Sequence, residues 1–165
     1  MAGQLLRTRY RGVVRHQKPD SLSRPFDGGS SREIVRQPKA YGFDTGLISW
    51  VNGWDTIRAG DRGLLWEHLV LDELRARFDD RQVHYWRDKS GREVDFVIDR
   101  GERTVDTVEA KISVDRFEAK NLHAFREIYP AGNNCLVVPY ADRPYRVRRK
   151  EIVLTVCEPS AISGQ

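Results

Sequence analysis

The sequence predicts an α/β fold in which a mixed sheet of four or five strands is flanked by helices. Residues 91–113 alternate apolar and polar side chains in two runs, which is typical of two short, half-buried strands joined by a polar turn. In the first strand the alternation places Val94, Phe96 and Ile98 on one face. Helical patterns of apolar residues lie on either side of this hairpin, at 62–78 and 115–129. With one strand before the hairpin and two after the second helix, the order is helix, three strands, helix, two strands.

The region before the hairpin contains the first helix. Residues 39–43 predict a short strand, and residues 47–54 predict a short helix or loop. Asp61 is expected to cap the helix 62–78, because a short polar side chain commonly precedes the first helical residue.

Glu67 occupies an unusual position on this helix. The apolar stripe of the helix leaves one position open, and Glu67 fills it. A carboxylate facing a core is costly unless it is paired or binds a metal. The alternative is that Glu67 lies at the edge of the stripe and reaches solvent. The stripe consists of Leu64, Leu71, Leu74 and Phe78.

Further segments complete the predicted sheet and its second helix. Residues 82–87 predict a strand by their β-propensity. Asp115 is expected to cap the second helix, with Glu118 three residues later completing a capping box. Residues 135–138 predict a buried strand, and residues 145–156 predict one more.

Three charged side chains converge in the predicted hairpin. Glu109 and Lys111 share a face of the second strand, because successive side chains alternate between faces. Any antiparallel register whose paired residue numbers have an even sum places Asp95 on that face, within roughly 5–8 Å of Glu109. Two carboxylates beside an ammonium are suited to a hard divalent cation. The alternative is the charged, solvent-exposed face of an ordinary hairpin.

Length and composition limit the function. The chain of 165 residues is long enough for one domain with a sizeable core, which we place at 38–157. A formal charge of +4 suits a nucleic-acid partner without requiring one. The two cysteines lack a zinc-ligand spacing. Neither a membrane span nor a signal peptide is recognisable, so we expect a cytoplasmic protein without a membrane partner.

The two ends of the chain differ from this central part. Residues 1–37 are basic and rich in Pro, Gly and Ser, which is typical of a loop-rich lead-in. They could follow phosphates as a basic arm or lie solvated. Residues 158–165 are expected to form a flexible tail. The candidate nucleic-acid contacts are basic side chains near the hairpin and in the last strand: Arg87, Lys89, Arg92, Arg146, Arg148 and Arg149.

Several segments together resemble a known family. A helix with Glu67, a strand with Val94-Asp95 and a strand with Glu109-Ala110-Lys111, in the order αβββαβ, resemble the PD-(D/E)xK nuclease superfamily, also called restriction-endonuclease-like. The segments KAYGFDTGLISW, LLWEHLVLDEL, VHYWRDKSGREVDFVID and VEAKIS more closely resemble the C-terminal domain of unknown function attached to a family of prokaryotic AAA-type ATPases. This resemblance covers about residues 38–140.

The resemblance implies a catalytic site for metal-dependent hydrolysis of DNA or RNA. By this resemblance, Asp95 and Glu109 hold Mg²⁺ or Mn²⁺, and the backbone carbonyl of Ala110 is a further ligand. Glu67 is an additional carboxylate of the site. Lys111 orients the attacking water and stabilises the charge that develops on the phosphate.

The chain contains no P-loop pattern G-x-x-x-x-G-K-[ST], so no ATP is expected, and residues 1–37 are interpreted as a remnant of an upstream segment. Three functions follow. The complete set of four site residues favours a metal-dependent nuclease. The missing P-loop favours a non-cleaving nucleic-acid-binding or regulatory module that partners a separate ATPase or self-associates. The short N-terminal region favours an inert fragment of a decayed gene.

Overall fold

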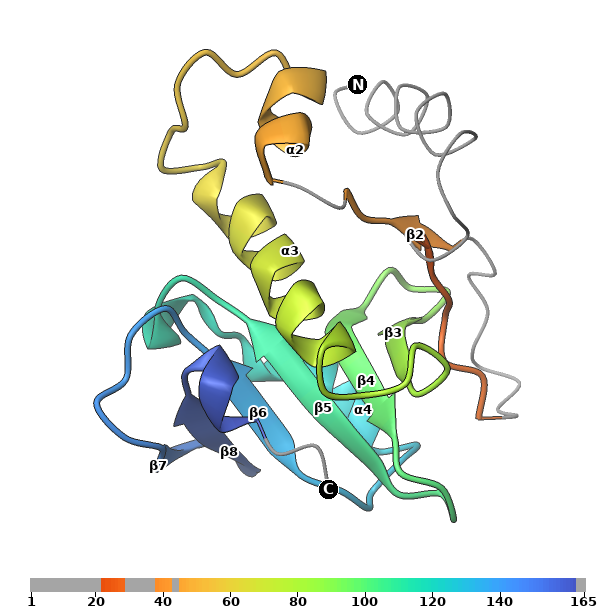
Figure 1. Cartoon of the computed structure of the whole chain (residues 1–165). Helices are drawn as coiled ribbons and strands as arrows, with labels where there is room; N and C mark the ends of the chain where they lie inside the picture. The colour runs from red at the N-terminus through yellow and green to blue at the C-terminus, as the bar shows by residue number, and fades with distance from the viewer. Residues whose placement is uncertain (1–21, 29–37, 43–44, 163–165) are drawn as a thin grey trace.

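The computed structural model describes residues 22–28, 38–42 and 45–162, and a six-stranded mixed sheet forms its centre (Figure 1). The strand order is β3-β4-β5-β6-β8-β7. Neighbours are antiparallel from β3 to β5, parallel from β5 through β6 to β8, and antiparallel again between β8 and β7. The strands are β3 (Val83–Arg87), β4 (Glu93–Asp99), β5 (Val105–Ala110), β6 (Asn134–Val137), β7 (Tyr145–Arg149) and β8 (Ile152–Cys157).

Helices cover both faces of this sheet, α3 on one and α4 on the other (Figure 1). This arrangement confirms the α/β class and the αβββαβ order. The helices and short turns are α2 (Thr45–Val51), α3 (Arg62–Arg75), η2 (Val114–Arg116), α4 (Ala119–Arg126) and η3 (Pro159–Ala161). No helix in the described part of the chain combines the length and apolar character that crossing a bilayer requires.

The sheet has one strand more than the largest number predicted. The region 145–156, predicted as a single strand, forms the antiparallel pair β7 and β8. Lys150 in the connecting turn has a φ of 55°, a left-handed conformation that β-turns often use. Neither Gly nor Asn marks this turn, so the sequence pattern predicted one continuous strand.

Both predicted helices end earlier, and the second also begins later. The prediction that Asp115 caps the second helix was wrong, because residues 114–116 form a short 3₁₀ turn and α4 begins at Ala119. Phe117 between them is extended and buried. Asp61 does precede α3, but its carboxylate accepts the N–H of Arg58 and makes no capping bond.

The hairpin of β4 and β5 is buried on both faces, which the prediction of half-buried strands did not anticipate. Alternation placed Val94 and Phe96 on one face, yet Val94 packs in the core under α4 and Phe96 in the core under α3. The cause is a register shift between β3 and β4. Trp86 pairs with Val94 while His84 pairs with Val97.

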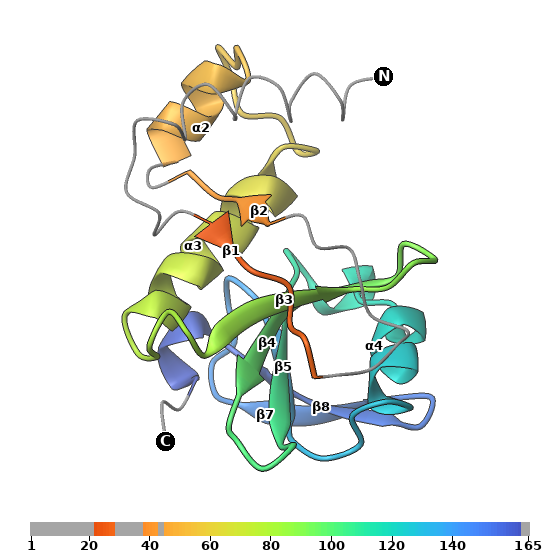
Figure 2. The ribbon, with the colours of Figure 1, turned by 90° about the vertical axis from the view of Figure 1, so that its right-hand side faces the viewer.

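The chain ends are attached to the sheet where they are described. The two-stranded pair β1 (Leu22–Ser23) and β2 (Lys39–Ala40) lies beside β3 (Figure 2). The segment after β1 joins β3, since the N–H of Phe26 donates to the carbonyl of Tyr85 at 2.7 Å. At the other end Ile162 is buried in the core under α3, so residues 158–162 are not the loose tail that was predicted. The rest of the predicted lead-in lies outside the described residues.

Candidate functional site

Asp95, Glu109 and Lys111 lie together in the hairpin, as predicted for a register whose paired residue numbers have an even sum. Phe96 pairs with Val108 and Val97 with Thr107, an even-sum register whose continuation sets Asp95 opposite Glu109. The ammonium of Lys111 contacts the Asp95 carboxylate and lies 2.8 Å from Glu109 Oε2. The N–H of Ala110 also donates to Asp95 Oδ2, at 3.0 Å. One short hairpin thus supplies two carboxylates and a shared cation.

Asp95 lies in a β-bulge. Between the pairs Trp86–Val94 and His84–Val97, strand β4 has two residues, Asp95 and Phe96, where β3 has one. A bulge bends the strand and redirects the side chain at the extra residue, and bulges are common beside active sites. Here the bulge allows Asp95 to contact Lys111, directly after β5, while its carboxylate also lies near α3.

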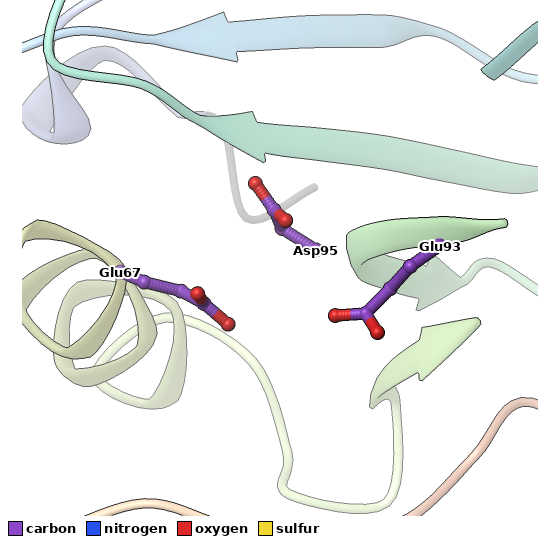
Figure 3. A group of neighbouring side chains, drawn as sticks. All are labelled: Glu67, Glu93 and Asp95. Atoms are coloured by element: carbon purple, nitrogen blue, oxygen red, sulfur yellow. The ribbon is translucent and has the colours of Figure 1, made fainter. Parts of the chain in front are cut away.

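Two more glutamates lie beside Asp95. Figure 3 shows Glu67 reaching from α3 toward Asp95 and Glu93, which both belong to β4. One carboxylate oxygen of each residue can be chosen so that all three lie within 4.8 Å of one another. Glu67 therefore faces the hairpin, with its side chain 20% exposed, and does not extend from the edge of the helical stripe into solvent. Glu109 contacts Lys111 but is not part of this group of three.

Residues from β2 and its continuation contact the same carboxylates. The ammonium of Lys39 lies 3.1 Å from Glu67 Oε1 and also contacts Glu93. The hydroxyl of Tyr41 donates to Glu67 Oε1 at 2.7 Å. Arg87 on β3 lies 2.7 Å from Glu93 Oε2. We define the acidic cluster as Glu67, Glu93, Asp95 and Glu109. Among the described residues, Lys39, Arg87 and Lys111 form ion pairs with it.

Burial and crowding of charge change the protonation of these groups. Burial, together with the nearby Asp95 carboxylate, raises the pKa of Glu109 well above its usual value, although Lys111 opposes this shift. Burial lowers the pKa of Lys111, but the attraction of Glu109 and Asp95 outweighs this and the net shift is upward. In the same way Glu67 and Glu93 give Lys39 a raised pKa. Both lysines therefore stay charged at neutral pH.

The predicted nucleic-acid contacts fall into two separate sets. Arg87 and Lys89 belong to β3 and the turn after it, and Arg92 pairs with Asp88 in that turn. Arg146, Arg148 and Arg149 are exposed on β7, at the opposite edge of the sheet (Figure 1). In the first set, Arg87 and Arg92 are bound to carboxylates of the fold itself.

Sequence reasoning missed Glu93, Lys39 and Tyr41. Glu93 is two residues from Asp95 on the same strand, so the alternation that selected Asp95 could have found it. Lys39 and Tyr41 contact Glu67 across 28 and 26 positions, and no local pattern reveals contacts of that range. The predicted role of the Ala110 carbonyl stays a prediction, since the contact seen here is made by its N–H.

Comparison with known proteins agrees with the resemblance to the C-terminal domain of AAA-type ATPases, whereas the resemblance to the PD-(D/E)xK superfamily stays a prediction. Uncharacterised proteins of Mycobacterium bovis and of Mycobacterium tuberculosis are each 35% identical to the chain over 79 residues. That match covers 46% of this chain and 18% of the length of each relative. Residues 62–158, more than half of the chain, match a domain of unknown function, DUF4143. The chain therefore belongs to the DUF4143 family, a domain found at the C-terminus of AAA-type ATPases in bacteria.

Proposed function

We propose that the protein is a metal-dependent phosphodiester hydrolase that cleaves DNA or RNA at the acidic cluster. The observation that carries this proposal is the convergence of Asp95, Glu109 and Lys111 on one bulged hairpin. An ordinary structural hairpin has little reason to bury two carboxylates side by side, because each raises the cost of charging the other. Stability given up in this way is typical of functional sites.

The residues present fit a hard divalent cation. Carboxylate oxygens are the donors that Mg²⁺ and Mn²⁺ prefer, and the cluster offers four carboxylates and no sulfur ligand. Asp95 and Glu109 are the proposed ligands, with the Ala110 carbonyl as a third. When bound, such a cation supplies Lewis-acid stabilisation and lowers the pKa of a water.

The side chains of the chain itself take the other roles in this proposal. Lys111 is held between two carboxylates, so its ammonium is fixed beside the place where a phosphate would bind. A fixed cation stabilises charge that develops on phosphate oxygens during cleavage. Glu67 projects from α3 and is oriented by Tyr41, so it can hold a water against the cluster.

A cleavage assay tests the proposal. Supercoiled plasmid and labelled single- and double-stranded oligonucleotides of DNA and RNA are incubated with the protein in Mg²⁺, in Mn²⁺ and in EDTA. We expect cleavage in at least one metal and none in EDTA. Absence of cleavage of every substrate in both metals contradicts the hydrolase proposal.

A second candidate function is a non-cleaving module that binds nucleic acid or regulates a separate ATPase. The observation that favours it is the family assignment, because such domains are found attached to AAA-type ATPases. The three cations around the cluster are also consistent with a site that is neutralised without metal. Binding to oligonucleotides in EDTA without cleavage in Mg²⁺ or Mn²⁺ is the result expected for this function.

A further inference from the structure

Lys39 occupies the space between two carboxylates of the acidic cluster. Its ammonium contacts Glu93 and lies 3.1 Å from Glu67 Oε1. Glu67, Glu93 and Asp95 are the three residues whose oxygens approach within 4.8 Å of one another. An ammonium bridging two of these three carboxylates makes the contacts that a metal ion would make at the same place.

The backbone fixes Lys39 in this position. Ser23 pairs with Lys39 in the β1–β2 ladder, and the segment after β1 is bonded to Tyr85 of β3. Two residues later Tyr41 is only 3% exposed, packs against Phe96 and donates to Glu67. Lys39 is therefore held from both sides and differs from a surface lysine that makes a chance ion pair.

The surroundings of the Lys39 ammonium are suited to a cation. The ammonium lies 5.4 Å from the ring centroid of Tyr85 and 5.9 Å from that of Tyr41, distances at which an aromatic face attracts a positive charge. The Lys39 side chain is 24% exposed, and those of Glu67 and Glu93 are 20% and 18% exposed. With so little solvent between them, these charges are weakly screened.

We infer that Lys39 is a resident cation of this site, which fills the position between Glu67 and Glu93 and keeps a divalent cation out of it. A metal ion and an ammonium cannot share the same oxygens, because each needs them at contact distance and the two repel each other. The inference extends the proposed function, since it concerns the same carboxylates. While Lys39 is in place, metal binding is left to Asp95 and Glu109, through the carboxylate oxygens other than Asp95 Oδ2 and Glu109 Oε2, which Lys111 contacts.

Removing the ammonium should create a new metal position. We expect the variant Lys39→Met to bind about one equivalent of Mn²⁺ more than the unaltered protein. The number bound is measured without nucleic acid, by titrating protein into Mn²⁺ and following the signal of free Mn²⁺ in electron paramagnetic resonance. The double variant Lys39→Met with Glu67→Gln should lose the additional equivalent, because the new position depends on the Glu67 carboxylate.

Two further variants serve as controls. Lys39→Arg keeps the positive charge and should bind the same number of Mn²⁺ ions as the unaltered protein. Lys120→Met removes an exposed lysine from α4, on the other face of the sheet, and should also leave the number unchanged. Circular dichroism establishes that each variant is folded. If Lys39→Met weakens the fold, Mn²⁺ should raise its melting temperature more than that of the unaltered protein, because a ligand that binds only the folded state stabilises it.

An unchanged or smaller number of bound Mn²⁺ ions in folded Lys39→Met overturns the inference. This result differs from a failure of the proposed function, which is measured by cleavage. If Lys39→Met binds one additional Mn²⁺ and the protein cleaves no substrate, the inference about Lys39 stands and the hydrolase proposal fails.

Discussion

The N–H of Ala110 donates a hydrogen bond across the hairpin to Asp95 Oδ2, with a nitrogen–oxygen distance of 3.0 Å. The carboxylate on the first strand is thus oriented by the backbone of the second. Lys111, one residue later, contacts the same oxygen. Because Asp95 lies in a β-bulge, these two contacts determine the direction of its carboxylate, which the regular alternation of the strand no longer sets.

Lys111 should be required for cleavage by the folded protein. A charged group at the phosphate contributes roughly 10²–10³ in rate, so Lys111→Ala is expected to reduce cleavage by at least about a hundredfold. If Lys111 only balances charge, its loss leaves cleavage intact and lowers only the stability, because Asp95 and the buried Glu109 lose their shared cation. Initial rates of oligonucleotide cleavage in Mg²⁺ or Mn²⁺ distinguish the catalytic role of Lys111 from the charge-balancing role.

The matched control for Lys111→Ala is Lys120→Ala, which removes an exposed lysine from α4. It should retain the full rate. Equal cleavage by Lys111→Ala and the unaltered protein would remove Lys111 from the proposed site.

Glu109 should make the fold less stable as pH rises. Burial raises the pKa of Glu109, so the folded state holds its proton to higher pH than the unfolded state does. The stability that this proton contributes is complete below the unfolded pKa and is lost as pH rises through the folded pKa. Glu109→Gln keeps the shape without the charge and should melt at a higher temperature than the unaltered protein at pH 8 in EDTA.

Thermal unfolding at several pH values measures this effect. The difference in melting temperature should shrink toward pH 5, because a growing fraction of the unaltered protein then carries an uncharged Glu109. For a domain of this size a stability change of about 1 kcal/mol moves the melting temperature by roughly 2–4 °C. A lower melting temperature of Glu109→Gln at pH 8 would show that the ion pair with Lys111 outweighs burial.

The hairpin was predictable because pairing in a sheet has a strict period of two. Asp95 and Glu109 share a face in any even-sum register, and the observed pair Phe96–Val108 belongs to that set. The bulge at Asp95 was not predictable, because no glycine or other local residue marks the extra position. Its consequence, that Val94 and Phe96 pack in different cores, depends on the partner strand β3.

Contacts between distant segments explain most of the remaining differences. Lys39 reaches Glu67 only because β1 and β2 pair with each other and the segment after β1 joins β3. The burial of Ile162 likewise depends on the core under α3, which the sequence near residue 162 does not describe. Glu93 is the exception, because its position two residues before Asp95 can be recognised in the sequence alone.

The arginines of β7 should contribute to nucleic-acid affinity if that edge contacts phosphates. Arg146, Arg148 and Arg149 are exposed on an edge strand, where charged residues also discourage pairing with another chain. For phosphate contacts, replacing all three by Gln should weaken binding and reduce its dependence on salt concentration, because fewer counterions are released. Fluorescence anisotropy of a labelled oligonucleotide at several salt concentrations measures both.

If the three arginines only protect the edge, the same variant should bind nucleic acid as before and associate into larger species. Light scattering detects that association. Unchanged affinity and an unchanged salt dependence would remove β7 from the proposed nucleic-acid contacts.

Cleavage by Asp95→Asn compared with Asp99→Asn is the measurement that tests the hydrolase proposal most directly. The two substitutions are identical and lie on the same strand, but Asp99 accepts the N–H of Gly101 at the far end of β4, away from Lys111. We predict that the unaltered protein and Asp99→Asn cleave nucleic acid in Mg²⁺ or Mn²⁺, while folded Asp95→Asn does not, since it lacks a ligand of the cation. Cleavage by Asp95→Asn at the rate of Asp99→Asn would contradict the proposal that the acidic cluster is the catalytic site.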